Sequence, residues 1–149
     1  MSVLAWDGHT LATDRQITNG NTITTPICKH ERYGAELLGL VGALGASRAM
    51  RDWYIAGANP DAFPKLRPDT NAVLIVVHAD GSLSEYSGEP YACRYAAGLP
   101  YAAGTGESAA LAAMRCGKTA AEAVQIACEV DIYCGGGVDV SALTDASAS

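Results

Sequence analysis

The sequence predicts an α+β fold in which antiparallel sheets are covered by helices on their outer faces. Most of the short apolar runs that read as strands follow one another across tight, glycine-containing turns, which is typical of antiparallel pairing. The helical segments are grouped instead of alternating with strands, so a doubly wound parallel sheet is not expected. With 149 residues, 49% of them hydrophobic, the chain can build one core, and we predict one domain over residues 1–149.

The first half of the chain predicts two hairpins and a helix. Asp7-Gly8 separates two apolar runs and favours a hairpin, because both residues accept the positive φ that such a turn requires. Tyr33-Gly34 supplies the second turn, and Pro26 indicates an irregular or edge position in the strand before it. The predicted strands cover residues 3–6, 10–13, 22–32 and 37–41, and the helix covers residues 47–56.

The second half predicts a hairpin, two helices and a closing strand. Residues 61–71 read as a loop, and Asp80-Gly81 turns the next hairpin. Thr119 and Glu122 form a capping box, in which each side chain can bond the other residue's backbone N–H. The strands cover residues 73–78, 83–86, 91–95, 101–103 and 138–143; the helices cover 107–116 and the segment from 119 to the glycines at 135–137; residues from about 144 to 149 form a flexible tail.

Charge and composition exclude several classes of function. Ten Lys and Arg face sixteen Asp and Glu, giving a net charge of −6, so a surface that follows nucleic-acid phosphates is not expected. No apolar run approaches the ~20 residues that span a bilayer, and no secretory signal is evident. Five cysteines without a C-x-x-C spacing predict neither a disulfide framework nor a zinc site. We therefore expect a cytoplasmic protein without a cofactor, a nucleic-acid partner or a membrane partner.

Ser2 is a candidate nucleophile because removal of Met1 would place a hydroxyl and a free α-amine on one residue. An α-amine has a pKa near ~7.7–8.0, so it can accept a proton close to neutral pH. Such a nucleophile carries its own base and needs no histidine. The ordinary explanation is that a small second residue merely favours methionine removal.

Further motifs follow Ser2 in a fixed order. They are D-R-Q-I-T at 14–18, Lys29, G-T-G at 104–106 before a helix, and D-I-Y-C-G-G at 131–136. Together they resemble the proteasome β-subunits and HslV-type peptidases, which are N-terminal nucleophile (Ntn) hydrolases. In that family an N-terminal Thr is followed by D-x-x-x-T, a Lys on the third strand, G-S-G and D-x-Y-S-G-G. The resemblance covers nearly the whole chain and is greatest to short proteasome-like proteins of phage genomes, which share A-W-D-G at 5–8.

The resemblance implies a four-layer αββα sandwich of two antiparallel sheets, with a catalytic role for each matching residue. Ser2 takes the place of the nucleophilic threonine, and Lys29 puts a positive charge beside its oxygen. Asp14 pairs with Lys29 and orients it. Gly42 matches the glycine whose backbone N–H faces the developing oxyanion. Thr18 matches the threonine whose backbone pairs with an extended peptide.

The remaining matches imply a set of hydrogen bonds around the amine. Thr105 replaces the serine of G-S-G, Asp131 matches the aspartate of the last motif, and Cys134 replaces its serine. A thiol is a weak donor and acceptor, so the relay through Cys134 is expected to be poorer. Serine at the nucleophile position lacks the methyl group that restricts χ1 of threonine.

Each of these positions also has an ordinary interpretation. Asp14 fits a turn residue at a strand end, and Lys29 fits a solvated charge on a strand. Thr105 between two glycines fits a helix N-cap. Cys134 and the other cysteines fit small buried packing residues. His9, His30 and His78 are interpreted as structural or surface residues.

The segment at 104–109, G-T-G-E-S-A, also satisfies the dinucleotide-binding pattern at a strand-to-helix junction. Glycines there would let a pyrophosphate approach the helix N-terminus. Glu107 would oppose that anion, and no βαβ unit follows to hold the rest of a dinucleotide. The sequence therefore favours the Ntn interpretation.

The resulting prediction is an Ntn amide hydrolase that cleaves peptides or unfolded protein with Ser2. By resemblance, we expect a homo-oligomeric ring, an ATP-dependent unfoldase as a partner, and a bacterial or phage-infected host cytoplasm. Two alternatives stay open: an inactive structural or partner-binding subunit with a decayed site, and an amidase of small molecules.

Overall fold

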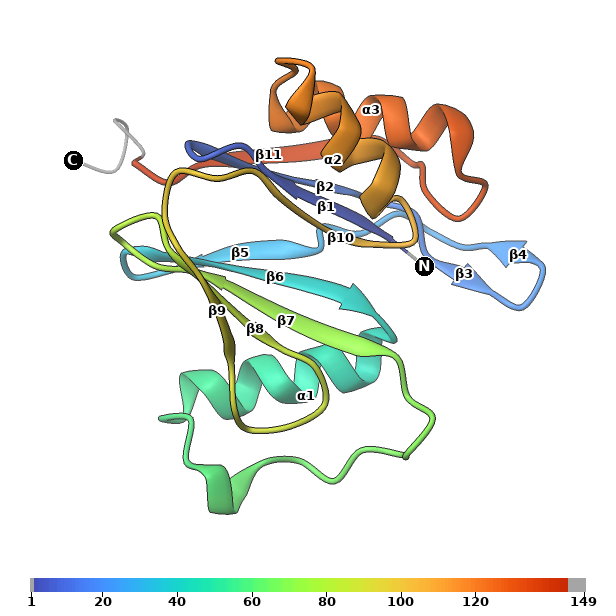
Figure 1. The fold of residues 1–149 in the computed structure, drawn as a ribbon. Coiled ribbons are helices and arrows are strands. Elements are labelled where there is room, and N and C mark those ends of the chain that lie inside the picture. The colour runs from blue at the N-terminus through green and yellow to red at the C-terminus, as the bar shows by residue number, and fades with distance from the viewer. Residues whose placement is uncertain (1, 145–149) are drawn as a thin grey trace.

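The computed structural model describes residues 2–144 and has four layers, with two stacked antiparallel sheets between helices (Figure 1). Every pair of neighbouring strands is antiparallel. The first sheet has the order β10 (Tyr101–Gly104), β1 (Val3–Trp6), β2 (Thr10–Asp14), β11 (Val138–Ala142). The second has the order β5 (His30–Tyr33), β6 (Glu36–Gly42), β7 (Ala72–Val77), β8 (Leu83–Tyr86), β9 (Cys93–Tyr95). The α+β, αββα prediction is confirmed.

The helices cover the outer faces of the two sheets. Helices α2 (Glu107–Arg115) and α3 (Ala120–Val130) pack on the first sheet, and α1 (Leu44–Ile55) packs on the second. Buried apolar side chains fill all three spaces between the layers. Leu4 and Trp6 of β1 point into the space between the sheets, whereas Val3 and Ala5 point toward α2 and α3. This alternation is the period-2 pattern of a strand that is buried on both faces.

The segment at 22–32 differs from its prediction as one strand. It divides into β4 (Thr22–Ile23), which pairs with β3 (Thr18–Asn19), and the separate strand β5. Pro26 lies in the irregular stretch between them, and proline cannot donate to a strand ladder. Lys29, predicted on a strand, lies just before β5, although its carbonyl still accepts from Leu40 N at 2.8 Å.

The predicted helices exist, with shifted ends. Helix α1 begins at Leu44, earlier than expected, and the loop after it holds a short 3-10 turn, Pro60–Ala62. The capping box of Thr119 and Glu122 opens α3 as predicted. Helix α3 ends at Val130, before the glycines, because Asp131 is already extended. The predicted tail lies outside the described residues, apart from residue 144. Within residues 2–144, no helix has the length and apolar character that crossing a bilayer requires.

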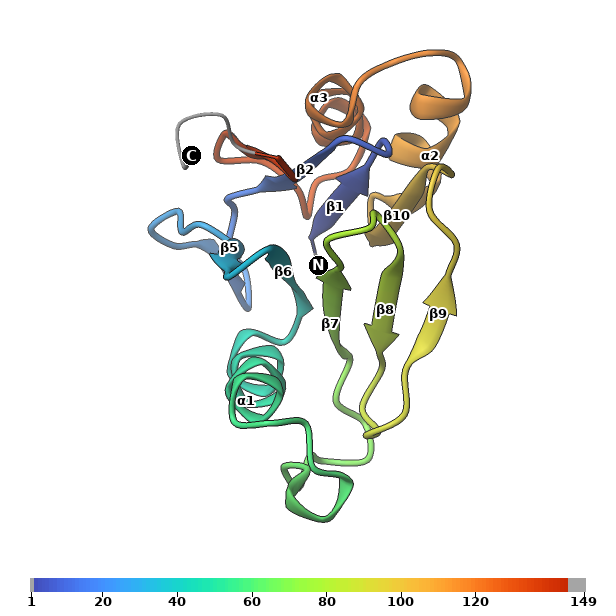
Figure 2. The same cartoon turned by 90° about the vertical axis from the view of Figure 1, so that its left-hand side faces the viewer.

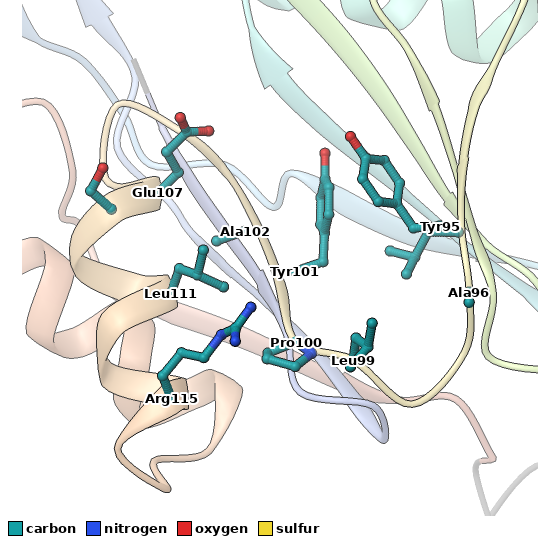
Figure 3. A pocket seen from close by; sticks show the side chains of 11 residues that line it. Tyr95, Ala96, Leu99, Pro100, Tyr101, Ala102, Glu107, Leu111 and Arg115 are labelled. Atoms are coloured by element: carbon teal, nitrogen blue, oxygen red, sulfur yellow. The ribbon is translucent and has the colours of Figure 1, made fainter.

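The two sheets diverge on the side of β9 and β10, which the chain connects through residues 96–100 (Figure 2). A cavity of about 440 Å³ lies there, between this connection and α2 (Figure 3). The rings of Tyr95 and Tyr101 stand next to each other in it, with centroids 5.0 Å apart. Arg115, in the last turn of α2, lines its far end.

Three cysteines contradict the prediction that all five are buried packing residues. Cys28, Cys93 and Cys116 are exposed, and only Cys134 is fully buried. The histidines are structural or exposed. His30 is buried and bonds Thr13 Oγ1 of β2 at 2.8 Å and Ser141 Oγ of β11 at 2.9 Å, whereas His9 is exposed.

We expect His30 to make stability depend on pH. Burial lowers the pKa of His30, although nearby Asp139 opposes this effect. Between the folded pKa and the unfolded value of ~6.5, the unfolded chain binds more protons than the folded chain, so stability falls as pH decreases below ~6.5. Urea unfolding at pH 7.5 and 5.5 should show a smaller pH-dependent loss for His30→Gln than for the wild type. His9→Gln is the exposed control, and an unchanged loss in His30→Gln would contradict this expectation.

Candidate active site

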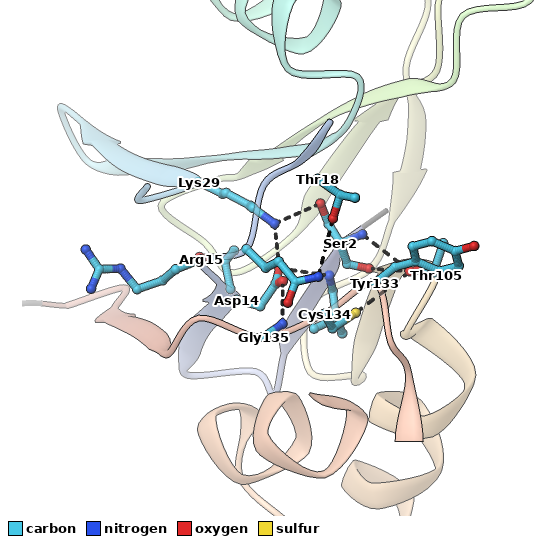
Figure 4. Close-up of polar contacts among 12 residues, drawn as sticks. Ser2, Asp14, Arg15, Thr18, Lys29, Thr105, Tyr133, Cys134 and Gly135 are labelled. Carbon is cyan, nitrogen blue, oxygen red and sulfur yellow. Dashed lines mark hydrogen bonds and ion pairs between the residues drawn. The ribbon is translucent and has the colours of Figure 1, made fainter. Parts of the chain in front are cut away.

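The hydroxyl of Ser2 lies beside a buried lysine–carboxylate pair (Figure 4). Lys29 Nζ donates to Ser2 Oγ at 3.2 Å and to Asp14 Oδ1 at 2.8 Å. Ser2 and Lys29 are 2% exposed and Asp14 is 0% exposed, so water screens these charges weakly. A cation this close to Oγ stabilises negative charge that develops on the oxygen.

Asp14 holds the centre of this arrangement. Its Oδ1 also accepts from Val3 N at 3.1 Å, and its Oδ2 accepts from Gly135 N at 3.1 Å. The carboxylate therefore joins the end of β2, the start of β1 and the loop after α3. Buried charges are tolerated when they are paired and hydrogen-bonded in this way. Asp14 is a buried organiser, not an exposed turn residue, and Lys29 is not a solvated charge.

Close backbone contacts fix Ser2 at the start of β1. Gly106 N donates to Ser2 O at 3.2 Å. Gly104 has φ +97°, and a Cβ there would lie 2.2 Å from Ser2 O, so only glycine fits. A Cβ at Gly106 would lie 2.9 Å from Val3 Cβ. The two glycines thus pack against the chain at β1 and leave no open cradle for a pyrophosphate, which disfavours the dinucleotide interpretation.

A chain of polar groups leads away from the backbone nitrogen of Ser2. Ser2 N donates to Thr105 Oγ1 at 3.4 Å, and Thr105 Oγ1 lies 3.8 Å from Cys134 Sγ. Cys134 Sγ in turn lies 3.4 Å from Asp131 Oδ2. The N-cap of α2 is Gly106, so Thr105 does not occupy the N-cap position of its ordinary interpretation. The structure thus brings together the three residues that the sequence assigned to a relay.

Burial and hydrogen bonds set the protonation states of Cys134 and Asp131. Burial raises the pKa of the Cys134 thiol to about 12, so the thiol stays protonated near neutral pH. Burial alone would raise the pKa of Asp131, but hydrogen bonds from Tyr133 N and from the Thr105 and Cys134 side chains outweigh it and lower this pKa. Asp131 is therefore an anion that accepts, and Cys134 is a neutral donor toward it.

Gly42 lies at the end of β6, across a cavity from Gly104 and Thr105. Its φ is +82°, and a Cβ would lie 2.2 Å from Asn71 O, so this close crossing of β6 and the segment before β7 requires glycine. Gly42 is thus placed at the wall of the site, while Asp14, Lys29 and Thr105 touch Ser2 or its neighbour directly.

Gln16 is a residue of the site to which the sequence assigned no role. Its Nε2 donates to Thr18 Oγ1 at 3.3 Å and to Ile132 O at 3.0 Å. It thereby ties the predicted substrate-pairing strand at Thr18 to the loop that carries Asp131 and Cys134. Arg15 N reinforces the same junction by donating to Gly135 O at 3.0 Å. Both residues lie inside the D-x-x-x-T motif, and this position was the sequence signal that could have identified them as residues of the site.

No protein-family model matches the sequence, and no curated protein is significantly similar to it. Solved structures do resemble it. HslV from Trypanosoma brucei matches with a TM-score of 0.70 and 22% identity, over 95% of this chain and 97% of that chain. The chain has the HslV and proteasome β-subunit fold. BPH from Thiobacillus denitrificans, a bacterial proteasome homologue, matches in complex with epoxomicin with a TM-score of 0.68 and 16% identity, over 97% and 100% of the two chains. A second BPH structure from Thiobacillus denitrificans matches with a TM-score of 0.67 and 16% identity, over 97% of this chain and 99% of that chain.

At 16–22% identity, the likeness concerns the proteasome-like fold, and the chemistry of the site follows from its own contacts. The hydroxyl of Ser2 lies against the buried ammonium group of Lys29, and the backbone nitrogen of Ser2 lies against the hydroxyl of Thr105. If that nitrogen becomes an amine, it can take a proton while the cation stabilises the attacking oxygen. These are the requirements of acyl transfer by a nucleophile that carries its own base.

Proposed function

We propose that this chain is an Ntn hydrolase that cleaves amide bonds of peptides or unfolded protein, with Ser2 as its nucleophile once Met1 has been removed. The observation that carries the proposal is the position of Ser2 Oγ, 3.2 Å from the buried Nζ of Lys29. The proteasome-like fold and the polar groups near Ser2 N support it.

In the proposed reaction, Ser2 Oγ attacks the carbonyl carbon and its proton passes to the α-amine of Ser2. The C–N bond of the substrate breaks, and the leaving amine takes that proton, which leaves an ester on Oγ. Water then attacks the ester and gives a proton to the α-amine. The ester C–O bond breaks, Oγ takes the proton back, and the carboxylic acid leaves.

Each neighbour has a proposed role in these steps. Lys29 stabilises Oγ as it becomes negative and repels a proton from the adjacent amine, so that the amine can act as the base. Asp14 positions Lys29, and Thr105 with Asp131 and Cys134 orients the amine. Gly42 is proposed to face the oxyanion with its backbone N–H, and Thr18 to pair with the extended substrate.

We further propose a homo-oligomeric ring in a bacterial or phage-infected cytoplasm, with an ATP-dependent unfoldase as a partner. Apolar residues exposed at the end of α3 support assembly, since Val130 is 72% and Ile132 is 81% exposed. Light scattering on the purified chain tests the ring, and a monomer that hydrolyses peptides would contradict it.

The decisive experiment controls the release of Ser2. The chain is produced with an N-terminal extension that a site-specific protease removes directly before Ser2. We expect hydrolysis of quenched fluorescent peptides and an epoxomicin adduct in the intact mass only after removal. Normally expressed protein should lack Met1 by mass spectrometry. Equal activity before and after removal would overturn the proposal, turnover of acylated small molecules alone would indicate an amidase, and no turnover would indicate an inactive subunit.

A further inference from the structure

A second cavity of about 440 Å³ lies between the two sheets and is lined in part by residues that contact Ser2. Its walls include Gly42 at the end of β6, Gly104 at the end of β10 and Thr105 directly after it. Two of these touch Ser2 directly, since Thr105 Oγ1 bonds Ser2 N and Gly104 approaches Ser2 O. A substrate held at Ser2 would therefore extend into this space.

The position of Thr105 decides which half of the substrate enters the cavity. In the proposed reaction, the leaving amine takes its proton from the Ser2 nitrogen, so it must lie on the same side as that nitrogen. Thr105 marks this side, because its Oγ1 lies 3.4 Å from Ser2 N, whereas Lys29 lies on the Oγ side. The cavity that Thr105 lines is thus the one that receives the leaving-group half.

Two carboxylates line this cavity. Glu85 of β8 lies on the face of its sheet that points toward the other sheet, like Ile75 with which it pairs. Its Oε2 accepts from Tyr101 Oη at 2.7 Å and from Tyr95 Oη at 3.0 Å, which fixes its orientation. Glu107, in the first turn of α2, completes the pair.

No positive side chain balances them. The cavity wall contains no Lys, Arg or His, and neither carboxylate forms an ion pair within residues 2–144. Figure 3 shows the Glu107 carboxylate and both tyrosine hydroxyls at one end of the view, with Arg115 at the opposite end. Glu85 and Glu107 both help to raise the pKa of Tyr101, after burial, as expected for two anions close to its hydroxyl.

We infer that this enzyme prefers amides whose leaving-group half carries a basic side chain, lysine or arginine, which Glu85 and Glu107 bind. The inference rests on the proposed function. A cation in a half-enclosed space gains from two carboxylates whose positions are already fixed, and an acidic side chain there meets repulsion. Tyr95 and Tyr101 add ring faces against which the aliphatic stem of such a side chain can pack.

The test uses one peptide that the enzyme cleaves, chosen from a mapped digest of an unfolded protein. It is synthesised with lysine, norleucine or glutamate directly after the cleaved bond. We expect kcat/KM for lysine to exceed that for norleucine about tenfold and that for glutamate by more. In Glu85→Gln/Glu107→Gln, the lysine-to-norleucine ratio should fall below about twofold. Glutamine at 85 still accepts from the tyrosines, which protects the fold.

Glu89→Gln is the matched control, because Glu89 is exposed in the β8–β9 loop and does not line the cavity. It should keep the wild-type ratio. Hydrolysis that requires Ser2 but shows no preference for lysine in the wild type would overturn the inference alone. Absence of any hydrolysis that requires Ser2 would overturn the proposed function, and the inference with it. The wild-type ratio decides the question even if the double variant fails to fold.

Discussion

Ser2→Ala should abolish peptide hydrolysis while the protein stays folded. The variant removes the attacking oxygen but keeps the backbone nitrogen and the Lys29–Asp14 pair, whose bond of 2.8 Å does not involve Ser2. Loss of a nucleophile that acts together with its base costs roughly 10⁴-fold or more in kcat. The lost hydrogen bond from Lys29 is worth about 1 kcal/mol of stability, because Lys29 keeps Asp14 as a partner.

Ser2→Thr is the matched variant, since it keeps the hydroxyl and adds only the methyl group that restricts χ1. We expect it to retain hydrolysis to within about tenfold, measured as kcat on the same fluorescent peptide. Thermal unfolding and light scattering should match the wild type for both variants. Ser2→Ala that cleaves the peptide at the wild-type rate would show that another group is the nucleophile.

Local sequence patterns were sufficient for most of the fold. The Asp7-Gly8 turn between β1 and β2 and the capping box at Thr119 are short-range signals, and both appear in the structure. The errors arose where long-range packing decides the outcome. Helix α1 begins at Leu44 because the chain turns there against Asn71, whose carbonyl accepts from Ala43 N at 2.7 Å. That contact joins segments that no window of neighbouring residues connects.

In the candidate site, too, local motifs identified some residues, whereas others become evident only from packing in the folded chain. Ser2, Asp14 and Lys29 stood out through the order of motifs, and the structure places them within hydrogen-bond distance. Their roles stay predictions until activity is measured. Glu85 and Glu107 could not be selected from the sequence, because Glu85 lies on β8 of the second sheet and Glu107 begins α2, which covers the first, and the two line one cavity only in the folded chain. A carboxylate on a strand is ordinarily a solvated charge, and a binding role for it can be inferred only from the residues that surround it in the folded structure.

The second large effect is expected for Lys29→Met, which should lose hydrolysis and also destabilise the protein. Asp14 is completely buried, and among residues 2–144 the variant leaves its carboxylate with the N–H groups of Val3 and Gly135 as donors. Removing one partner of a buried ion pair costs about 3–5 kcal/mol. Urea unfolding should show this loss, and kcat should fall because no cation stabilises Oγ.

A double variant separates these two consequences. Asp14→Asn/Lys29→Met carries no buried charge at this place, so it should be more stable than Lys29→Met alone, although an asparagine amide cannot accept from both N–H groups. Its activity should stay absent, because the electrostatic requirement of the attacking oxygen is still unmet. Recovery of stability without recovery of kcat would assign the pair a role in catalysis beyond holding the fold.

Lys118→Met supplies the control for losing a lysine. Lys118 Nζ lies 4.0 Å from Glu122 Oε2, and both side chains are about half exposed, so water and salt screen this pair and it contributes little to stability. The variant should unfold and hydrolyse like the wild type. If Lys29→Met cost no more stability than Lys118→Met, water would have to reach Asp14 and replace the lysine. The site would then lack the low-dielectric surroundings on which the activation of Ser2 by Lys29 depends.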